Sequence, residues 1–192
     1  DYVRHVQTTY PNRKLLGLGL AMPGFIDLTS GKILFSVRAP QWQNFPFRAR
    51  LESELGLPVM IENDVDCMTF AELAHANMPD ATDMLYLGFS EGVKVSILLG
   101  GQLLKGPFGN TGMIGRTVAS RNELQEIASV STVCREFDQR VAAISAPNGV
   151  LQAITTLTDR NAKFKAILDA TETEPLCNDL ITAVIDTLAE EI

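Results

Sequence analysis

Residues 85–118 read LYLGFSEGVKVSILLGGQLLKGPFGNTGMIGRTV, and the glycines and apolar runs of this stretch organise the interpretation of the whole chain. The apolar runs at 84–87 and 93–99 predict two strands that fold back on each other around a turn at 90–92. The pair Gly100-Gly101 then predicts a second tight turn, because glycine adopts backbone angles that other residues avoid. The stretch therefore predicts a glycine-rich strand pair.

The first of these turns is a candidate phosphate-binding element. Where glycine allows a close approach, backbone N–H groups converge on a phosphate, so Gly92 and Lys94 are candidates for the remnant of a phosphate loop. Glu91 lies in the same turn, and its negative charge would repel a phosphate by about 1 kcal/mol even in water. Lys94 would offset that charge, although we favour its alternative interpretation as a solvated strand residue.

The composition is that of an acidic globular protein. Of the 192 residues, 46% are hydrophobic and 20% are charged, enough for one substantial core or two small ones. A formal net charge of -7 argues against a nucleic-acid surface, so any contact with DNA must come from outside this segment. No apolar run approaches the roughly 20 residues of a membrane span and no signal leader is recognisable, which predicts a cytoplasmic protein without membrane contact.

The three cysteines, Cys67, Cys134 and Cys177, are far apart in the chain, and only two histidines accompany them. A structural zinc site usually needs four Cys or His ligands with short spacings such as Cys-x-x-Cys, and none is present. The sequence therefore predicts no metal site and three buried free thiols.

The hydrophobic pattern predicts alternating strands and helices along the chain. The expected helices are 1–10, 47–55 ended by Gly56, 65–76, 123–142, 150–170 and 176–191, and the expected further strands are 14–21, 25–26, 33–35 and 58–62. The buried face of the helix at 65–76 is expected to carry Met68, Ala71, Leu73 and Ala74. Residues 77–80 are interpreted as a linker, which predicts a first α/β domain at 1–79 and a second at 80–192 with a helical C-terminal portion.

Several motifs follow one another in an order that is shared with a known family. They are Gly17-Leu18-Gly19, Met22-Pro23-Gly24-Phe25-Ile26-Asp27, Glu62-Asn63-Asp64, Gly92-Val93, Gly106, Gly112 and Gly115-Arg116. This order resembles the signature of the ROK family of repressors, open reading frames and sugar kinases. Lys94 and Ser96 depart from it, since the family usually carries Gly at the first position and Gly or Ala at the second.

The resemblance implies an α/β fold of the actin-like (ribonuclease H-like) ATPase type with two domains. In the family, an Asp-x-Gly-x-Thr phosphate loop precedes the strand that we expect at 14–21, and a further strand closes the second sheet. Neither is found in this sequence. We therefore expect the architecture to be incomplete at both the N-terminus and the C-terminus.

Asn63 and Asp64 follow the strand expected at 58–62, and ligands of open α/β sheets lie at the carboxyl ends of strands. The resemblance implies that Asn63 contacts a sugar and that Asp64, in a kinase, is the general base for a sugar hydroxyl. The alternative is that Asn63 or Asp64 caps the following helix, which is a frequent role of both residue types. The two interpretations are compatible, and we keep both.

The other sugar-binding positions of the family are changed in this chain. The replacements are Met113 for a Glu, Arg116 for the zinc-binding His, Gln125 for a second Glu and Arg38 for an Asn. The zinc-binding Cys-x-Cys-Gly segment is also absent, and residues 120–123 stand in its place. The resemblance thus implies a ligand site without zinc. Because Arg116 carries a fixed cation in a fork geometry, we expect the site to favour an anionic sugar over a neutral hexose.

These features predict the effector-sensing and oligomerisation part of a sugar-responsive ROK transcriptional regulator that lacks kinase activity. The expected partners are a small sugar or sugar phosphate and further copies of the chain, in a dimer or tetramer. No cofactor is expected. DNA would be bound only through a helix-turn-helix domain before Asp1.

Two alternatives stay open. One is an active, glucokinase-like ROK kinase that phosphorylates a hexose with ATP and Mg and uses Asp64 as its catalytic base; Glu91, Met113 and Arg116 disfavour it. The other is a dimerisation scaffold without a ligand. The sequence upstream of Asp1 would distinguish the regulator from the kinase. A helix-turn-helix there indicates the regulator, and an Asp-x-Gly-x-Thr hairpin alone indicates the kinase.

Overall fold

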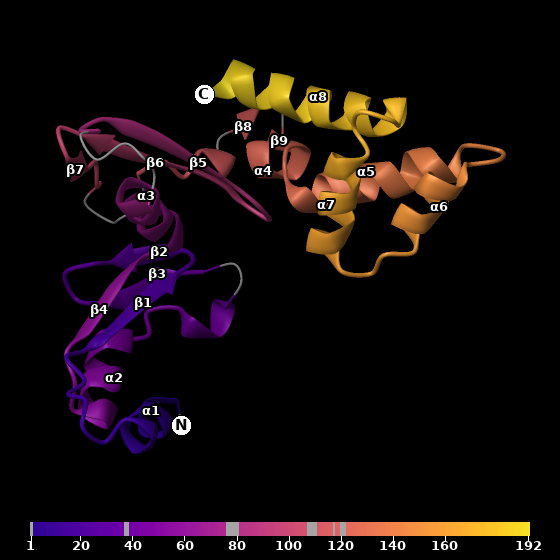
Figure 1. The fold of residues 1–192 in the computed structure, drawn as a ribbon. Coiled ribbons are helices and arrows are strands. Elements are labelled where there is room, and N and C mark those ends of the chain that lie inside the picture. The colour runs from indigo at the N-terminus through magenta and orange to yellow at the C-terminus, as the bar shows by residue number, and fades with distance from the viewer. Residues whose placement is uncertain (1, 37–38, 76–80, 107–110, 117, 120–121) are drawn as a thin grey trace. The chain divides into compact units, whose positions relative to one another are not determined.

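The computed structural model describes residues 2–36, 39–75, 81–106, 111–116, 118–119 and 122–192. Its chain forms two compact units: unit 1 comprises Asp1–Tyr86 with Ser96–Gly112, and unit 2 comprises Leu87–Val95 with Met113–Ile192. The division runs through the paired strands β5 (Met84–Phe89) and β6 (Val93–Leu99), which contribute residues to both units. The boundary predicted after residue 79 lies outside the described residues and stays a prediction. The helices and strands confirm the α/β class (Figure 1).

Unit 1 contains a parallel strand pair. β1 (Leu18–Met22) pairs with β4 (Val59–Asn63), in a register that runs from Leu18↔Val59 to Met22↔Asn63. β4 packs against the helix α2 (Phe47–Leu55), and Val59 and Ile61 are buried in a cluster against which Phe47 and Leu51 of that helix pack. Parallel strands require a long crossover connection, and the segment that contains α2 supplies it. The first bond of the pair is donated by the Leu18 N–H to the Pro58 carbonyl at 2.8 Å, so β1 begins later than the predicted residue 14.

A short antiparallel hairpin follows β1 and confirms the two strands predicted at 25–26 and 33–35. Its strands are β2 (Phe25–Asp27) and β3 (Lys32–Phe35). The Asp27 carboxylate accepts a hydrogen bond from the Ser30 hydroxyl at 2.6 Å and from the backbone N–H groups of Ser30 and Thr29 at 3.3 and 3.0 Å. These bonds, that of the hydroxyl above all, lower the pKa of Asp27. A charged acceptor thus holds the turn in shape.

Two predicted chain reversals are confirmed at glycines with positive φ. α2 ends at Gly56, whose φ is 63°. Gly100 and Gly101, with φ of 58° and 76°, form the two-residue turn between β6 and β7 (Gln102–Leu103). Positive φ at both turn residues matches the twist of the flanking strands, which is why glycine is favoured in such turns.

The helix α3 (Asp64–His75) confirms the predicted helix, but its predicted buried face is wrong. Three of the four residues expected to be inward are exposed and the last is half-buried: Met68, Ala71, Ala74 and Leu73. The covered face instead runs along Val65, Thr69 and Leu73, and Thr69 is fully buried. A search for apolar residues misses Thr69 because threonine carries a polar hydroxyl. That hydroxyl can be buried because it donates to the Val65 carbonyl within the helix, at 3.1 Å.

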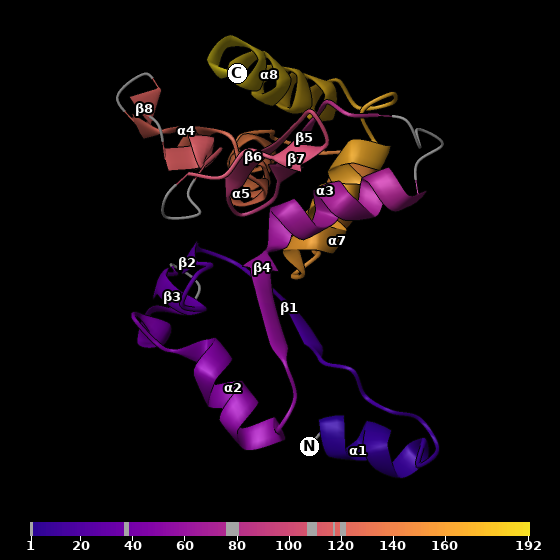
Figure 2. The same ribbon diagram turned by 90° about the vertical axis from the view of Figure 1, so that its left-hand side faces the viewer.

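Unit 2 is mainly helical. Its helices are α4 (Leu124–Ile127), α5 (Val130–Ala142), α6 (Gly149–Thr155), α7 (Arg160–Asp169) and α8 (Pro175–Glu191). α5 packs against α6, α7 and α8, and α8 runs across the other helices in Figure 1 and Figure 2. Phe137 of α5 is fully buried in the core, together with Val133, Ile167, Cys177 and Leu180.

Two predicted helices of unit 2 are each divided by a capping residue. The helix predicted at 123–142 is interrupted at Ser129, which is extended and accepts a bond from the Thr132 N–H at 3.3 Å, so that α5 begins anew. The helix predicted at 150–170 is interrupted before Asp159, which starts α7 by accepting from the Ala162 N–H at 2.7 Å. A side-chain oxygen that satisfies free amide groups favours a new helix over continuation of the old one.

The remaining elements of the described residues are short. They are α1 (Tyr2–Thr9), the 3₁₀ helices η1 (Pro40–Trp42) and η2 (Ile114–Arg116), and the antiparallel strands β8 (Val118–Ala119) and β9 (Asn122–Glu123). Among the helices that the structure describes, none combines the length and apolar character needed to cross a bilayer.

The cysteine prediction is confirmed at two of three positions. Cys134 and Cys177 are buried free thiols, whereas Cys67 is free but only partly buried. In all three, burial is the main cause of a raised pKa, because it disfavours the thiolate.

Candidate functional site

The carboxyl end of β4 and the start of α3 form a polar turn at residues 62–66, which we call the strand-end corner. Asn63 is 3% exposed; its amide nitrogen donates to the Gly24 carbonyl at 3.3 Å, and its amide oxygen accepts from the Val65 N–H at 3.0 Å. Asp64 accepts from the same Val65 N–H at 3.0 Å. Both side chains thus accept from the same backbone N–H in the first turn of α3, where the helix dipole favours oxygen atoms. The capping role is present, and the ligand role stays a prediction.

Sequence reasoning missed the cation of this corner. Lys105, which follows β7, forms an ion pair with Glu62, and its Nζ lies 3.8 Å from an Asp66 carboxylate oxygen. The other Glu62 oxygen accepts from the Asn63 N–H at 2.8 Å. Lys105 and Glu62 are 43 residues apart, so no local pattern could have paired them. Lysine therefore offsets part of the negative charge that the corner carries.

The pKa of Cys67 depends on the charged side chains of the strand-end corner. Burial is the main cause of its raised pKa, and the carboxylates of Glu62 and Asp66 raise that pKa further. Lys105 acts in the opposite direction, because its cation stabilises the thiolate. The thiol of Cys67 is thus protonated at neutral pH, and its pKa depends on Lys105.

In unit 2, the turn between β5 and β6 is fastened to two helices through Glu91. One Glu91 oxygen accepts a hydrogen bond from the Ser131 hydroxyl, and the other lies 3.1 Å from Arg160 Nη1. The same Arg160 nitrogen donates to the Ser131 oxygen at 3.0 Å, and the Ser90 carbonyl accepts from the Val130 N–H at 2.9 Å. The Glu91 anion that the sequence placed in this turn is therefore balanced by Arg160, 69 residues away.

The interpretation of Lys94 as a solvated residue is wrong. Its residue exposure is 5%, and it lies in the run Val93–Ser96, all of which is buried. Lys94 has an interaction partner, as a buried ammonium requires. A buried cation thus follows Gly92 closely, and a phosphate-binding role for the two residues stays a prediction.

Arg116 and Gln125 are brought together by a residue that the sequence did not single out. Arg116 Nη2 lies 3.1 Å from Oε1 of Glu123, and Gln125 Nε2 donates to Oε2 of Glu123 at 2.7 Å. The Arg116 side chain is 40% exposed and that of Glu123 is 30% exposed. Met113, just before η2, is half-buried. The only signal in the sequence was that Glu123 occupies the place of the missing zinc segment.

Close packing of Gly115 places this group beside the turn at Gly92. A Cβ atom on Gly115 would lie 2.7 Å from the Val93 carbonyl oxygen and 2.9 Å from the Val93 nitrogen, so η2 approaches β6 more closely than a side chain permits. A Cβ atom on Gly92 would lie 3.7 Å from Gln125 Oε1. The residues Gly92, Arg116, Glu123 and Gln125 therefore belong to one neighbourhood.

The predicted ligand residues fall into two groups. Asn63 and Asp64 belong to unit 1, whereas Met113, Arg116 and Gln125 belong to unit 2. Arg38 lies outside the described residues. No group of three or more His, Cys, Asp or Glu side chains arranged for a metal ion is found in the described part of the chain.

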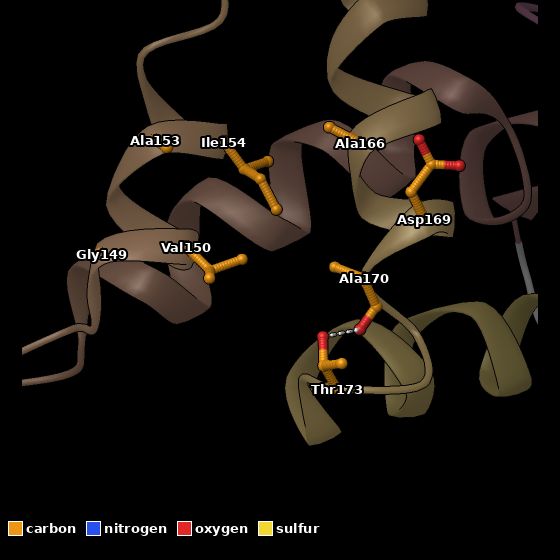
Figure 3. Close-up of a pocket in the computed structure, with 8 residues that line it drawn as sticks. All are labelled: Gly149, Val150, Ala153, Ile154, Ala166, Asp169, Ala170 and Thr173. Atoms are coloured by element: carbon orange, nitrogen blue, oxygen red, sulfur yellow. Dashed lines mark hydrogen bonds between the residues drawn. The ribbon is translucent and has the colours of Figure 1, made fainter.

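Unit 2 also carries an open groove of about 490 Å³ that the sequence did not indicate. It lies between α6 and α7, and Figure 3 shows Val150 and Ile154 on one side and Ala166 and Ala170 on the other. Asp169 is the charged residue of its lining, and Lys165 pairs with it at 2.6 Å. The groove is mostly apolar, with little to orient a polar ligand.

Solved structures with the same fold define the class to which the chain belongs. A crystal structure of a ROK family transcriptional regulator, a homologue of the E. coli MLC protein, superposes with a TM-score of 0.81 over 97% of this chain and 48% of the other, at 20% identity. This similarity establishes the actin-like α/β fold. The chain belongs to the ROK family, whose pattern it matches over residues 3–192.

Curated relatives include both regulators and kinases. A putative xylose repressor from Caldicellulosiruptor sp. (strain Rt8B.4) is 28% identical over 119 residues, which are 62% of this chain and 30% of the repressor. A glucokinase from Halalkalibacterium halodurans is 36% identical over 101 residues, which are 53% of this chain and 30% of the glucokinase. The chain thus spans about a third of the length of these relatives.

Proposed function

We propose that this chain is the sugar-sensing and oligomerisation part of a ROK transcriptional regulator and does not transfer phosphoryl groups. The observation that carries the proposal is the Glu91 carboxylate, which Ser131 and Arg160 hold in the turn before β6. Phosphoryl transfer depends on neutralising negative charge at the transferred phosphate. A carboxylate fixed at a glycine-containing turn supplies no such positive charge, and it engages the Arg160 cation that could supply it. The similarity to a xylose repressor is consistent with this proposal.

The proposed ligand is a small sugar or sugar phosphate. Asn63 and Asp64 would contact its hydroxyl groups, because an amide both donates and accepts hydrogen bonds and a carboxylate accepts them. Met113, Arg116, Gln125 and Arg38 are proposed as further ligand residues, as the family resemblance implies. No zinc ion or other cofactor is part of the proposal.

The assembly and location belong to the same proposal. A regulator of this type would act in the cytoplasm as a dimer or tetramer. Its contact with DNA would come from a helix-turn-helix domain outside residues 1–192, since this segment has a net charge of -7 and would repel DNA phosphates.

The second candidate function is a ROK sugar kinase. It is favoured by the 36% identity to a glucokinase and by the position of Asp64 at the carboxyl end of β4, where a general base could accept a proton from a sugar hydroxyl. This function would require ATP and Mg.

Calorimetry and an enzyme assay on the full-length protein separate the candidates. We would titrate xylose, glucose, N-acetylglucosamine and glucose 6-phosphate and run a coupled ATP assay with Mg. The regulator should bind at least one of them without ATP turnover. Turnover with any neutral sugar that is lost in Asp64→Asn would establish the kinase instead, and the absence of binding by all four would favour a scaffold.

A further inference from the structure

We propose that Lys105 is a positioning residue of the sugar site, which clamps the strand-end corner and ties it to β6. This inference rests on the proposed contact of Asn63 and Asp64 with a sugar. Lys105 itself need not touch the ligand. Its role is to hold the backbone that presents the ligand residues.

Lys105 contacts the strand-end corner at residues on both sides of Asn63 and Asp64 in the chain. Lys105 Nζ pairs with Glu62 and lies 3.8 Å from Asp66, and these two carboxylates flank Asn63-Asp64-Val65 in the chain. The side chains of Lys105 and Glu62 are each 27% exposed and that of Asp66 is 13% exposed. Partly buried charges are screened less than surface charges, so this cluster is stronger than an ordinary surface ion pair.

Glu62 connects the lysine directly to the backbone of the ligand residue. One of its oxygens binds Lys105, and the other accepts from the Asn63 N–H at 2.8 Å. Loss of the cation would free the Glu62 side chain to turn toward solvent. The Asn63 N–H would then lose the Glu62 acceptor, and the orientation of the Asn63 amide group would become less defined.

The residue that precedes Lys105 is hydrogen-bonded to β6. Leu104, the neighbour of Lys105, donates its N–H to the Ile97 carbonyl of β6 at 2.8 Å. Ordering of the corner by a ligand must therefore also order the segment around Leu104, and the coupling is reciprocal. The Leu104 amide is an independent reporter, because it lies outside the proposed site.

The test compares hydrogen exchange and sugar affinity in variants of the full-length protein. Lys105→Met keeps the aliphatic stem and removes the charge, Lys105→Arg keeps the charge, and Lys165→Met is the control because it removes an exposed ion pair of unit 2. We expect Lys105→Met to speed exchange at Asn63 and Leu104 and to weaken the best-binding of xylose, glucose and glucose 6-phosphate by about tenfold. Lys105→Arg should keep the exchange rates at Asn63 and Leu104 and the sugar affinity close to those of the wild type. Lys165→Met should change neither the exchange rates nor the affinity.

The bound state supplies a second measurement. In the wild type the sugar should slow exchange at Leu104, and in Lys105→Met this protection should be lost. Unchanged exchange at Asn63 in Lys105→Met would overturn the clamp, and faster exchange with unchanged affinity would overturn its positioning role. If Lys105→Met does not fold, Glu62→Gln carries the same expectations. If the wild type binds none of the sugars, the proposed function fails, while exchange at Asn63 and Leu104 still decides whether the clamp exists.

Discussion

Arg116 and Glu123 form an ion pair in which Nη2 of the arginine lies 3.1 Å from Oε1 of the glutamate. An anionic ligand that approaches Arg116 must therefore compete with a carboxylate of the protein itself. Glu123 also accepts from Gln125, so that displacement of its side chain would disturb two predicted ligand residues together. This arrangement reduces the advantage that a free arginine would give to an anionic sugar.

The first prediction concerns the charge of the ligand. Arg116→Ala should weaken glucose 6-phosphate by about tenfold, which is the lower end for a charge-assisted hydrogen bond, and should weaken glucose less. Glu123→Gln should strengthen the phosphate ester selectively, because the competing anion is removed. Calorimetry would measure both, with Arg140→Ala, which breaks the exposed pair with Glu136, as control. Equal losses for the two ligands in Arg116→Ala would contradict the charge argument.

The second prediction concerns the close approach of η2 to β6. Gly115→Ala should lower the free energy of unfolding by about 2 kcal/mol, because the new methyl group would meet the Val93 backbone at 2.7 and 2.9 Å. Gly149→Ala is the matched control, since a Cβ atom there would meet nothing within 4 Å. Urea denaturation followed by circular dichroism measures the difference. Similar stability in the two variants would show that η2 is held less tightly than described.

The third prediction concerns the buried lysine of the helical core. Lys163 Nζ lies 2.9 Å from both Asp138 oxygens and 3.3 Å from the Thr155 carbonyl, and its side chain is 9% exposed. Asp138→Ala should cost about 2 kcal/mol, less than for a fully buried pair because Asp138 is 43% exposed. Lys163→Met should cost less, because it leaves the remaining charge in contact with water.

Urea denaturation of the single and double variants tests this ordering. The double variant should be close to Lys163→Met, since Asp138 contributes through the lysine. Lys165→Met should stay within about 0.5 kcal/mol of the wild type, because its pair with Asp169 is exposed. A larger loss in Lys163→Met than in Asp138→Ala would contradict the assignment of the cost to an unpaired buried cation.

The fourth prediction concerns pH. Burial raises the pKa of Cys134 and Cys177 in the folded chain, so each thiol stays protonated there at a pH where it ionises in the unfolded chain. Their contribution to stability is therefore present below roughly pH 8.5 and is lost as the pH rises through the folded-state pKa. The free energy of unfolding should fall in that range, by at most about 1.4 kcal/mol per pH unit for each thiol.

Denaturation at pH 7.5, 8.5 and 9.5 tests the sign. The decrease of the free energy of unfolding with pH should be smaller in Cys134→Ala and Cys177→Ala than in the wild type, whatever the absolute stability of these variants. A slope that does not change would mean that the two thiols titrate alike in the folded and unfolded chains.

Local signals in the sequence accounted for the α/β alternation, the strand pair around Glu91 and the reversals at Gly56 and Gly100-Gly101. These features depend on backbone angles and on the period of apolar residues, which neighbouring residues control. The caps at Ser129 and Asp159 are equally local, with the amides of Thr132 and Ala162 three residues on. We missed them because an apolar period that continues through a capping residue favours one long helix.

What the sequence by itself determined, then, is the family, the order of the elements and the place of Asn63 and Asp64 between a strand and a helix. Only the tertiary structure decided which charges meet. Lys105 reaches Glu62 across 43 residues and Arg160 reaches Glu91 across 69, while Lys94 is buried although its residue type suggested solvent. The physical reason is that burial and ion pairing depend on how distant segments pack, whereas periodicity and turn chemistry describe only neighbours along the chain.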